Sequence, residues 1–400
     1  MASPETVPPE VEEPKSKTQA PTQEPEKVLE ADALKILRVA SDVYPEVMGG
    51  LSLHVHEMSR VQAEMGHDVT VLTSDHGDRD QPSREERDGY ELIRHREVAS
   101  PLDNTITPGL ARTLRRIGDD YDVIHAHSHL FFSTNVAAAV GRTLETPLVV
   151  TNHGLMSQTA PKWVQKAFIP TVAKFTLNSA DEILCYTETD KRRLRERGID
   201  SSISVVHNGI DCEQFSPIQS DKSKNQILFV GRIKPGKGVR HLLAAFSNII
   251  SEFPEYSLKI VGDGPLREEL VALAEERDIS SNVEFVGQIE NSEVAEVYAE
   301  SEIFVLPSLN EGLPRTVLEA MACEVPVIVS DLEQLESLVE EAGVTVPREN
   351  PDILASEMKR LLANKELRTH MGRVGRECIL DEYSWDETVR FTTCKYRSLI

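Results

Sequence analysis

Short apolar runs alternate with amphipathic helical stretches along most of the chain, and this alternation constrains the fold more than any other feature. Strands of this kind, separated by helices, predict right-handed crossovers and a parallel sheet that helices cover on both faces. The predicted strands fall into two series: 34–41, 67–74, 90–96, 121–127, 147–152, 180–186 and 203–207, then 226–230, 257–261, 283–286, 302–306, 326–330 and 344–346. We therefore expect an α/β protein with two doubly wound sheets.

The chain divides where this alternation begins, breaks and ends. Residues 1–33 are rich in Pro, Glu, Thr and Gln and carry almost no large apolar side chains, which predicts a disordered tail because little surface can be buried. The other expected parts are a first Rossmann-like domain at 34–208, a linker at 209–225, a second Rossmann-like domain at 226–382 and a terminal helix at 383–400.

The charge balance narrows the class of protein. With 66 acidic and 43 basic residues, the net charge of -23 argues against nucleic-acid binding, which requires Lys and Arg to neutralise phosphates. The five scattered cysteines form no Cys-x-x-Cys pair and predict reduced thiols. No signal peptide is recognisable, and no apolar run approaches the roughly 20 residues that span a bilayer. We expect a cytoplasmic protein.

Two glutamates with seven residues between them, Glu311 and Glu319, lie where a buried strand turns into a helix near Pro314. Glu311 falls in the turn, whereas Glu319 falls inside the helix. The free N–H groups and the positive dipole of a helix N-terminus favour a phosphate, and carboxylates can bind hydroxyl groups. This combination suits a nucleotide sugar.

A basic, glycine-rich loop that carries Arg232 and Lys237 follows the first strand of the second series. This loop and the Glu311 turn both follow the carboxyl ends of predicted parallel strands, where such sheets bind their ligands. The loop is not a Walker motif, and no complete dinucleotide Gly-x-Gly-x-x-Gly is present. The alternative is a surface turn whose basic side chains are merely solvated.

Taken together, these motifs resemble family 4 of the retaining glycosyltransferases. The resemblance runs from Leu34 to Ile400 and rests on Gly49-Gly50, Asp122-Val-Ile-His-Ala-His, Thr151-Asn-His-Gly, His207-Asn-Gly, Gly231-Arg232 through Lys237-Gly238, and Glu311 through Glu319. It implies the GT-B fold, in which two Rossmann-like domains face an interdomain cleft and a C-terminal helix crosses back. It also implies transfer of a hexosyl group from a nucleotide diphosphate sugar, with UDP favoured, to an acceptor hydroxyl with retention.

The resemblance assigns roles to individual residues. Arg232 and Lys237 would contact the diphosphate, Glu311 and His153 would lie beside the transferred sugar, and Glu319 would bind the ribose. The other donor-binding residues that it implies are Gly49, Gly50, Gly312, Leu313 and Arg315. No Asp-x-Asp sits at the end of a predicted strand to hold a divalent ion, so we expect the two cations to replace a metal. No metal or other cofactor is expected.

The sequence signals for acceptor binding are less specific than those for donor binding. Residues 161–180 lack carboxylates and combine aromatic side chains with lysines, which predicts either peripheral contact with an anionic membrane or a core helix with solvated lysines. The residues concerned are Lys162, Trp163, Lys166 and Lys174, with a second basic group at Arg112, Arg115 and Arg116. We expect a glycan or lipid-linked acceptor, at the inner face of the membrane if the membrane is contacted, with acceptor contacts in loops 75–89 and 100–109.

Two other functions fit the same residues. A nucleotide-sugar epimerase of the same fold would need no acceptor, so incubation with the donor alone would distinguish it. A non-catalytic sugar-nucleotide-binding protein is less consistent with the charged set of Arg232, Lys237, Glu311 and Glu319, which a scaffold does not need.

Overall fold

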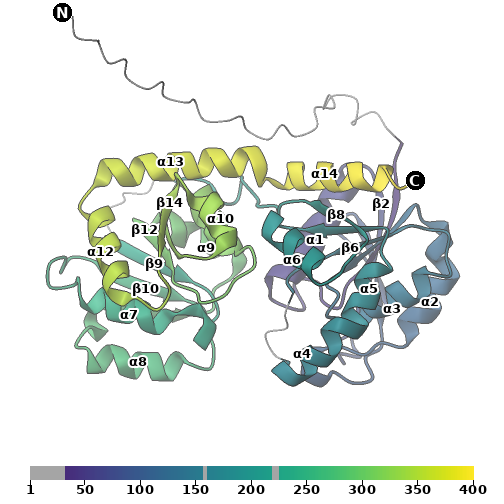
Figure 1. The fold of residues 1–400 in the computed structure, drawn as a ribbon, viewed down its shortest axis with the longest axis horizontal. Helices are drawn as coiled ribbons and strands as arrows, with labels where there is room; N and C mark the ends of the chain where they lie inside the picture. The colour runs from purple at the N-terminus through teal and green to yellow at the C-terminus, as the bar shows by residue number, and fades with distance from the viewer. Residues whose placement is uncertain (1–31, 156–159, 219–224) are drawn as a thin grey trace, which may run out of the picture. The chain divides into compact units, whose positions relative to one another are not determined.

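The computed structural model describes residues 32–155, 160–218 and 225–400, and the two series of predicted strands form two separate sheets (Figure 1). The predicted tail and residues 219–224 of the predicted linker lie outside the described residues, apart from the last residues of the tail. Each predicted strand is present, and its ends differ from the prediction by no more than two residues.

Within the described residues, the first sheet has eight strands in the order β3-β4-β2-β1-β5-β6-β7-β8, all parallel except the β3–β4 pair. The strands are β1 (Lys35–Val39), β2 (Asp68–Ser74), β3 (Arg84–Arg87), β4 (Tyr90–His95), β5 (Val123–His127), β6 (Leu148–Thr151), β7 (Glu182–Cys185) and β8 (Ser202–Val205). The helices that accompany them are α1 (Gly50–Glu64), α2 (Gly109–Ile117), α3 (Phe132–Gly141), α4 (Lys162–Phe168), α5 (Lys174–Asn178) and α6 (Glu188–Glu196).

Strand β3 lies in the segment 75–89, which the sequence predicts to be a loop, so that prediction is wrong for these four residues. Its sequence, Arg-Glu-Glu-Arg, contains no apolar side chain because the strand is an edge that pairs with β4 alone. Arg84 forms an ion pair with Glu91 across the pair. Charge on an edge strand is a common protection against pairing with another chain.

The second sheet is entirely parallel, with six strands in the order β11-β10-β9-β12-β13-β14 among the described residues. These strands are β9 (Gln226–Val230), β10 (Ser257–Val261), β11 (Val283–Gly287), β12 (Ile303–Leu306), β13 (Val327–Ser330) and β14 (Gly343–Val346). Its helices are α7 (Val239–Ser247), α8 (Arg267–Glu276), α9 (Asn291–Ala299), α10 (Arg315–Ala322), α11 (Glu333–Val339), α12 (Pro351–Leu362) and α13 (Lys365–Glu382).

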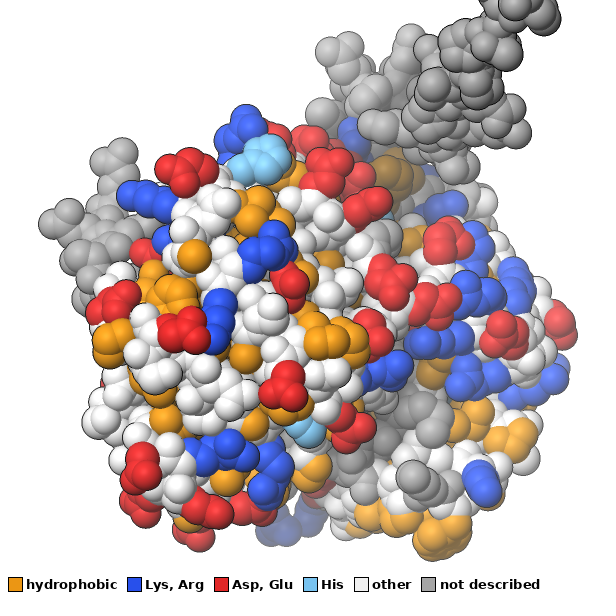
Figure 2. Space-filling view, turned by 60° about the vertical axis from the view of Figure 1, so that its left-hand side comes forward, with side chains coloured by type: hydrophobic (Ala, Val, Ile, Leu, Met, Phe, Trp, Pro, Cys, Tyr) orange, Lys and Arg blue, Asp and Glu red, His pale blue; other side chains and the backbone are white. Residues whose placement is uncertain are grey.

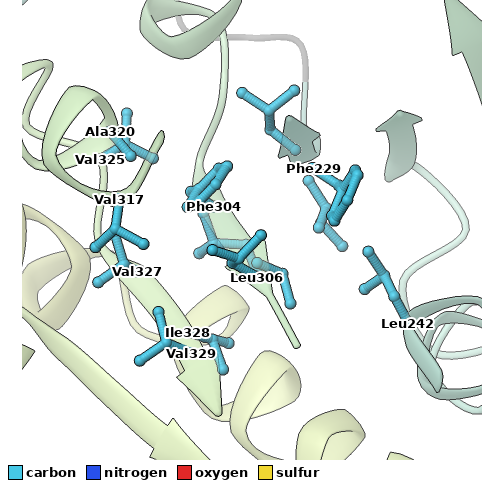
Figure 3. Close-up of a cluster of buried hydrophobic side chains, with 14 of the residues drawn as sticks. Phe229, Leu242, Phe304, Leu306, Val317, Ala320, Val325, Val327, Ile328 and Val329 are labelled. Atoms are coloured by element: carbon cyan, nitrogen blue, oxygen red, sulfur yellow. The ribbon is translucent and has the colours of Figure 1, made fainter. Parts of the chain in front are cut away.

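The core of this second half holds the strands that precede the predicted donor loops. Phe229 of β9 and Phe304 of β12 are fully buried together with Val317 of α10, and Figure 3 shows them in one cluster of apolar side chains. Burial of such side chains contributes roughly 1.5–3 kcal/mol each. The ends of β9 and β12 and the start of α10 are therefore held by a packed core.

The last helix, α14 (Trp385–Arg397), returns to the first half and packs against α1, as the resemblance predicts (Figure 1). The Tyr396 hydroxyl lies 2.5 Å from Nδ1 of His125 on β5, and Gln62 of α1 donates a hydrogen bond to Thr393 at 3.3 Å. Buried polar contacts of this kind are directional, so they fix the orientation of α14.

Over the face that Figure 2 shows, acidic and basic side chains are interspersed, as expected of a solvated surface. Among the described residues, no helix is long and apolar enough to cross a bilayer. The basic, aromatic segment consists of α4, a π-helical turn (Ile169–Ala173) and α5, and Trp163 and Phe175 are 74% and 43% exposed. The alternative of a core helix is therefore wrong for α4. The side chain of Lys162 lies outside the described residues.

Candidate active site

Two loops at the carboxyl ends of neighbouring strands bring the predicted donor residues together. Lys237 lies after β9 and Glu311 after β12, and these strands are hydrogen-bonded neighbours in the sheet. The Lys237 ammonium donates a hydrogen bond to Oε1 of Glu311 at 2.5 Å, with 16% and 8% of the two side chains exposed. Parallel pairing thus explains how residues 74 positions apart in sequence come into contact.

The close packing of these two loops depends on Gly238, which follows Lys237. Gly238 has a φ of 68°, in the left-handed region that favours glycine. A Cβ atom at this position would lie 2.0 Å from the carbonyl oxygen of Pro307, in the loop after β12. The backbone N–H of Leu309 also donates to the carbonyl of Gly236 at 2.9 Å. These contacts hold Lys237 against the Glu311 turn.

The loop after β9 is electropositive. Burial and the nearby charges of Lys237 and Arg232 lower the pKa of Lys234. The three basic side chains of this loop therefore repel one another. Arg232 is exposed on this loop. Such a loop stabilises an anionic ligand, because an anion relieves the repulsion among the cations.

Helix α10 begins at Arg315, directly after the Glu311 turn. Apart from its two chain neighbours, no described residue has an atom within 4 Å of the place where a Cβ of Gly312 would be, so space beside this turn is open to a ligand. Gln334 donates to the carbonyl oxygen of Glu311 at 2.5 Å and fixes the turn from the side of α11. Gly312 and Leu313 therefore lie beside the free N–H groups at the start of α10.

Glu319 is buried inside α10 and already has two partners. The Tyr298 hydroxyl donates a hydrogen bond to its Oε2 at 3.0 Å, and Nε of Arg315 lies 3.6 Å from its Oε1. Burial raises the pKa of Glu319, while the charge of Arg315 opposes the rise. The predicted contact of Glu319 with a ribose would have to share these oxygens, and it stays a prediction.

Arg315 also connects the two halves of the chain. Its guanidinium donates to the carbonyl oxygen of Gly209 at 2.9 Å and lies 5.9 Å from the centre of the Trp385 ring. Gly49 and Gly50 form the start of α1, and a Cβ of Gly50 would lie 3.5 Å from Cδ of Arg315. The structure therefore places Gly50 of the predicted glycine pair beside a predicted donor-binding residue of the second half.

His153, which follows β6, lies in a cluster of aromatic side chains of the first half. Its Nδ1 is 2.8 Å from the Tyr186 hydroxyl and its Nε2 is 3.0 Å from Nδ1 of His127. Burial lowers the pKa of His153 well below its usual range, so its imidazole is neutral near pH 7. Within the described residues, His153 makes no hydrogen bond to Lys237 or Glu311.

His125 and His127 are two residues apart on β5, so they point to the same side of the strand, and their ring centroids are 4.2 Å apart. The neighbours of this cluster on other elements, His54 on α1 and Tyr186 after β7, were not predicted. Their rings lie 5.0 and 5.4 Å from that of His153. A histidine inside an amphipathic helix carries no signal that distinguishes it from an ordinary polar residue.

Among the described residues, one group of side chains offers metal-ligand atoms close together: His54, His127 and His153 each have a candidate atom within 4.8 Å of the others. All three pKa values are lowered by burial, that of His54 to about 3. Neutral imidazoles are common ligands for zinc and related ions.

Comparison with known proteins agrees with this arrangement. Residues 48–214 match the model of glycosyltransferase family 4, and residues 212–378 match that of the group 1 glycosyl transferases. A glycogen synthase of Mycobacterium tuberculosis is 26% identical over 91% of this chain and 94% of its own length.

Two solved structures show the same fold. Sucrose-phosphate synthase from Thermosynechococcus elongatus has a TM-score of 0.77 at 24% identity, over 91% of this chain and 99% of that one. Anabaena HepE in complex with UDP-glucose has a TM-score of 0.74 at 17% identity, over 92% and 100% of the two chains.

The two mostly parallel α/β sheets and these structural matches show the GT-B fold. The family-model matches show that the chain is a glycosyltransferase. The matches to the two family models, which together run from residue 48 to residue 378, identify the chain more closely. It belongs to glycosyltransferase family 4.

Proposed function

We propose that this glycosyltransferase moves a hexosyl group from a nucleotide diphosphate sugar to an acceptor hydroxyl, with retention at the anomeric carbon and without a metal ion. UDP-sugars are the favoured donors, because HepE binds UDP-glucose with the same fold. The observation that carries the proposal is the contact between Lys237 and Glu311 at the start of α10. A cation, a carboxylate and a helix N-terminus meet there, and together they match a diphosphate joined to a sugar.

The charges of this site suit the bond that must break. When the anomeric carbon separates from the diphosphate oxygen, negative charge grows on the phosphate and positive charge grows on the sugar ring. Lys237, Arg232 and the α10 N-terminus would stabilise the departing diphosphate, which removes the need for a divalent ion. Glu311 would face the positively charged ring.

Retention would follow if the acceptor oxygen attacks from the face that the diphosphate leaves. The acceptor O–H proton would then pass to a diphosphate oxygen as the new glycosidic bond forms, so no enzyme nucleophile is required. His153, as a neutral imidazole, would hydrogen-bond the sugar rather than carry charge. To do so, it would exchange one of its present partners, His127 or Tyr186, for a sugar hydroxyl.

The acceptor proposed is a glycan or a lipid-linked saccharide. The exposed aromatic side chain of Trp163 and the lysines Lys166 and Lys174 support contact with an anionic lipid surface. This segment also lines a cavity of about 240 Å³, whose mostly apolar lining includes Leu155, Ile169, Ala173 and Leu177 together with Lys174 and Arg197. Such a lining would suit an apolar part of the acceptor.

A screen of nucleotide sugars by thermal shift, followed by acceptor trials with the best donor, tests this function. NMR of the product should show the same anomeric configuration as the donor, and an inverted product would refute retention. Exhaustive chelation should leave turnover unchanged, whereas activity that is lost and then restored by Mg²⁺ or Mn²⁺ would refute metal independence. Conversion of the donor without any acceptor would indicate an epimerase instead.

A further inference from the structure

The cluster of His54, His127 and His153 has features beyond those of a packed group of rings. It joins three separate elements, since His54 lies on α1, His127 ends β5 and His153 follows β6. One candidate ligand atom of each lies within 4.8 Å of the other two. In a tetrahedral zinc site, Zn–N bonds of about 2.0–2.1 Å place ligand nitrogens about 3.4 Å apart. Shifts of about 1.5 Å or less would therefore close the three imidazoles around one ion.

One pair of nitrogens is already near that spacing. Nδ1 of His127 and Nε2 of His153 are 3.0 Å apart, and they are joined by a single hydrogen bond. A metal ion would replace the shared proton with only a slight increase in this distance. The His153 ring is held from its other side by the Tyr186 hydroxyl at 2.8 Å.

His54 has the hydrogen-bond arrangement that is usual for a metal-binding histidine. Its Nδ1 lies 2.8 Å from Oδ1 of Asn208, which can only accept a hydrogen bond, so Nδ1 carries the proton. Nε2 then has a free lone pair, and within the described residues it has no hydrogen-bond partner although the side chain is 2% exposed. A ligating histidine typically donates its other ring N–H to such an oxygen, which fixes the tautomer and the ring orientation.

We propose that these three histidines bind a single zinc ion or a similar transition-metal ion, and that binding inhibits the enzyme. The ion would be held by one ring nitrogen of each residue and would keep a fourth position for water. The ion takes up Nε2 of His153 and fixes the ring with Nδ1 on the Tyr186 hydroxyl, so neither nitrogen is left for the transferred sugar. The inhibitory effect rests on the proposed role of His153, but the site itself does not.

The surroundings set a limit on the affinity. The positive charges of Arg315 and Arg38 act on His54, and no carboxylate belongs to the group of ligands. A divalent ion is therefore less stable here than in a structural site built from thiolates. His153 is the least buried of the three, so an ion would enter past it. Binding should be reversible and sensitive to chelators, as an inhibitory site requires.

Zinc binding to the full-length chain without an affinity tag tests the site. Equilibrium dialysis should give one zinc per chain that X-ray absorption assigns to nitrogen ligands at about 2.0–2.1 Å, rather than to thiolate sulfur at about 2.3 Å. His54→Gln should weaken this binding at least tenfold. His56→Gln is the matched control, because His56 is a buried histidine of the same helix that instead contacts Tyr90 at 3.0 Å.

The proposal is overturned if zinc does not bind, if its ligands are sulfur, or if His54→Gln binds as the wild type does. Should His54→Gln fail to fold by circular dichroism, Asn208→Ala replaces it, with an expected loss of about tenfold because the ring of His54 loses its orienting partner. Zinc should also slow glycosyl transfer, and a chelator should restore it. Zinc that binds through three imidazoles without slowing turnover would overturn the inhibitory effect and leave the proposed glycosyl transfer untouched.

Discussion

Lys237 and Glu311 touch in the free protein, yet they should have opposite effects on the binding of a nucleoside diphosphate. The ammonium group donates to the Glu311 carboxylate, 2.5 Å away, so it must break or share this contact when it binds a phosphate. Removing Lys237 deletes an attractive charge, whereas removing the charge of Glu311 deletes both a competitor for Lys237 and a repulsion of the diphosphate.

The magnitude follows from the kind of contact that is lost. A hydrogen bond to a charged group contributes about 1.5–3 kcal/mol, which corresponds to a roughly 10- to 150-fold change in affinity. Lys237→Met should therefore bind UDP roughly 10- to 150-fold more weakly than the wild type. Glu311→Gln should bind UDP at least as tightly as the wild type. The double variant should bind UDP more tightly than Lys237→Met, because the repulsion by Glu311 is gone, but more weakly than Glu311→Gln.

Calorimetric titration of each variant with UDP at one ionic strength measures these effects without an acceptor. Arg240→Met is a matched control, because Arg240 lies on α7 near the same loop but pairs with Glu269 at the surface. It should leave UDP affinity unchanged. If Glu311→Gln weakened UDP binding as much as Lys237→Met does, Glu311 would be a nucleotide ligand and the division of roles would be wrong.

Two further predictions concern stability. Burial disfavours a charge on Glu46, but hydrogen bonds from Arg87 and Arg94 outweigh this and lower its pKa from 4.5 to about 2. The ionised Glu46 should therefore add about 2–3 kcal/mol to the free energy of unfolding above pH 4.5, and this contribution should be lost as the pH falls towards 2. When unfolding is measured as a function of pH, Glu46→Gln should be less stable than the wild type at neutral pH and equally stable at pH 2. Tyr396→Phe removes the buried hydrogen bond to His125 and should lower the free energy of unfolding by about 1–3 kcal/mol. Amide hydrogen exchange should then show faster opening of α14, and an unchanged exchange rate would contradict the anchoring role of Tyr396.

The fold was largely predictable because the buried strands are short, apolar and separated by helices. The burial of β12 on both faces gives the continuous run Ile-Phe-Val-Leu, which sequence reasoning recognises directly. Strand β3 could not be found in this way, because an exposed edge strand needs no apolar side chain and its pairing depends on β4. The local sequence pattern predicts strands that are buried in the core. It does not predict an exposed edge strand such as β3, whose pairing is stabilised by charged side chains.

The candidate site was predictable only in part. The loops of Lys237 and Glu311 follow predicted strand ends, so parallel pairing was enough to expect them together. Tyr298 lies on α9 and its bond to Glu319 depends on how two helices pack, which no local signal encodes. The histidine cluster likewise combines a helix with the ends of two strands, and the position of His54 beside His153 follows from tertiary packing alone.

A crystal structure of the protein with its nucleotide diphosphate sugar is the most direct test of the donor site. We predict that the diphosphate lies within hydrogen-bond distance of Lys237 Nζ and the α10 N-terminus, with Glu311 beside the sugar. In that complex, the contact between Lys237 and Glu311 should be broken or shared. A donor bound at the strand ends of the first sheet, with Lys237 and Glu311 still paired only to each other, would contradict this account.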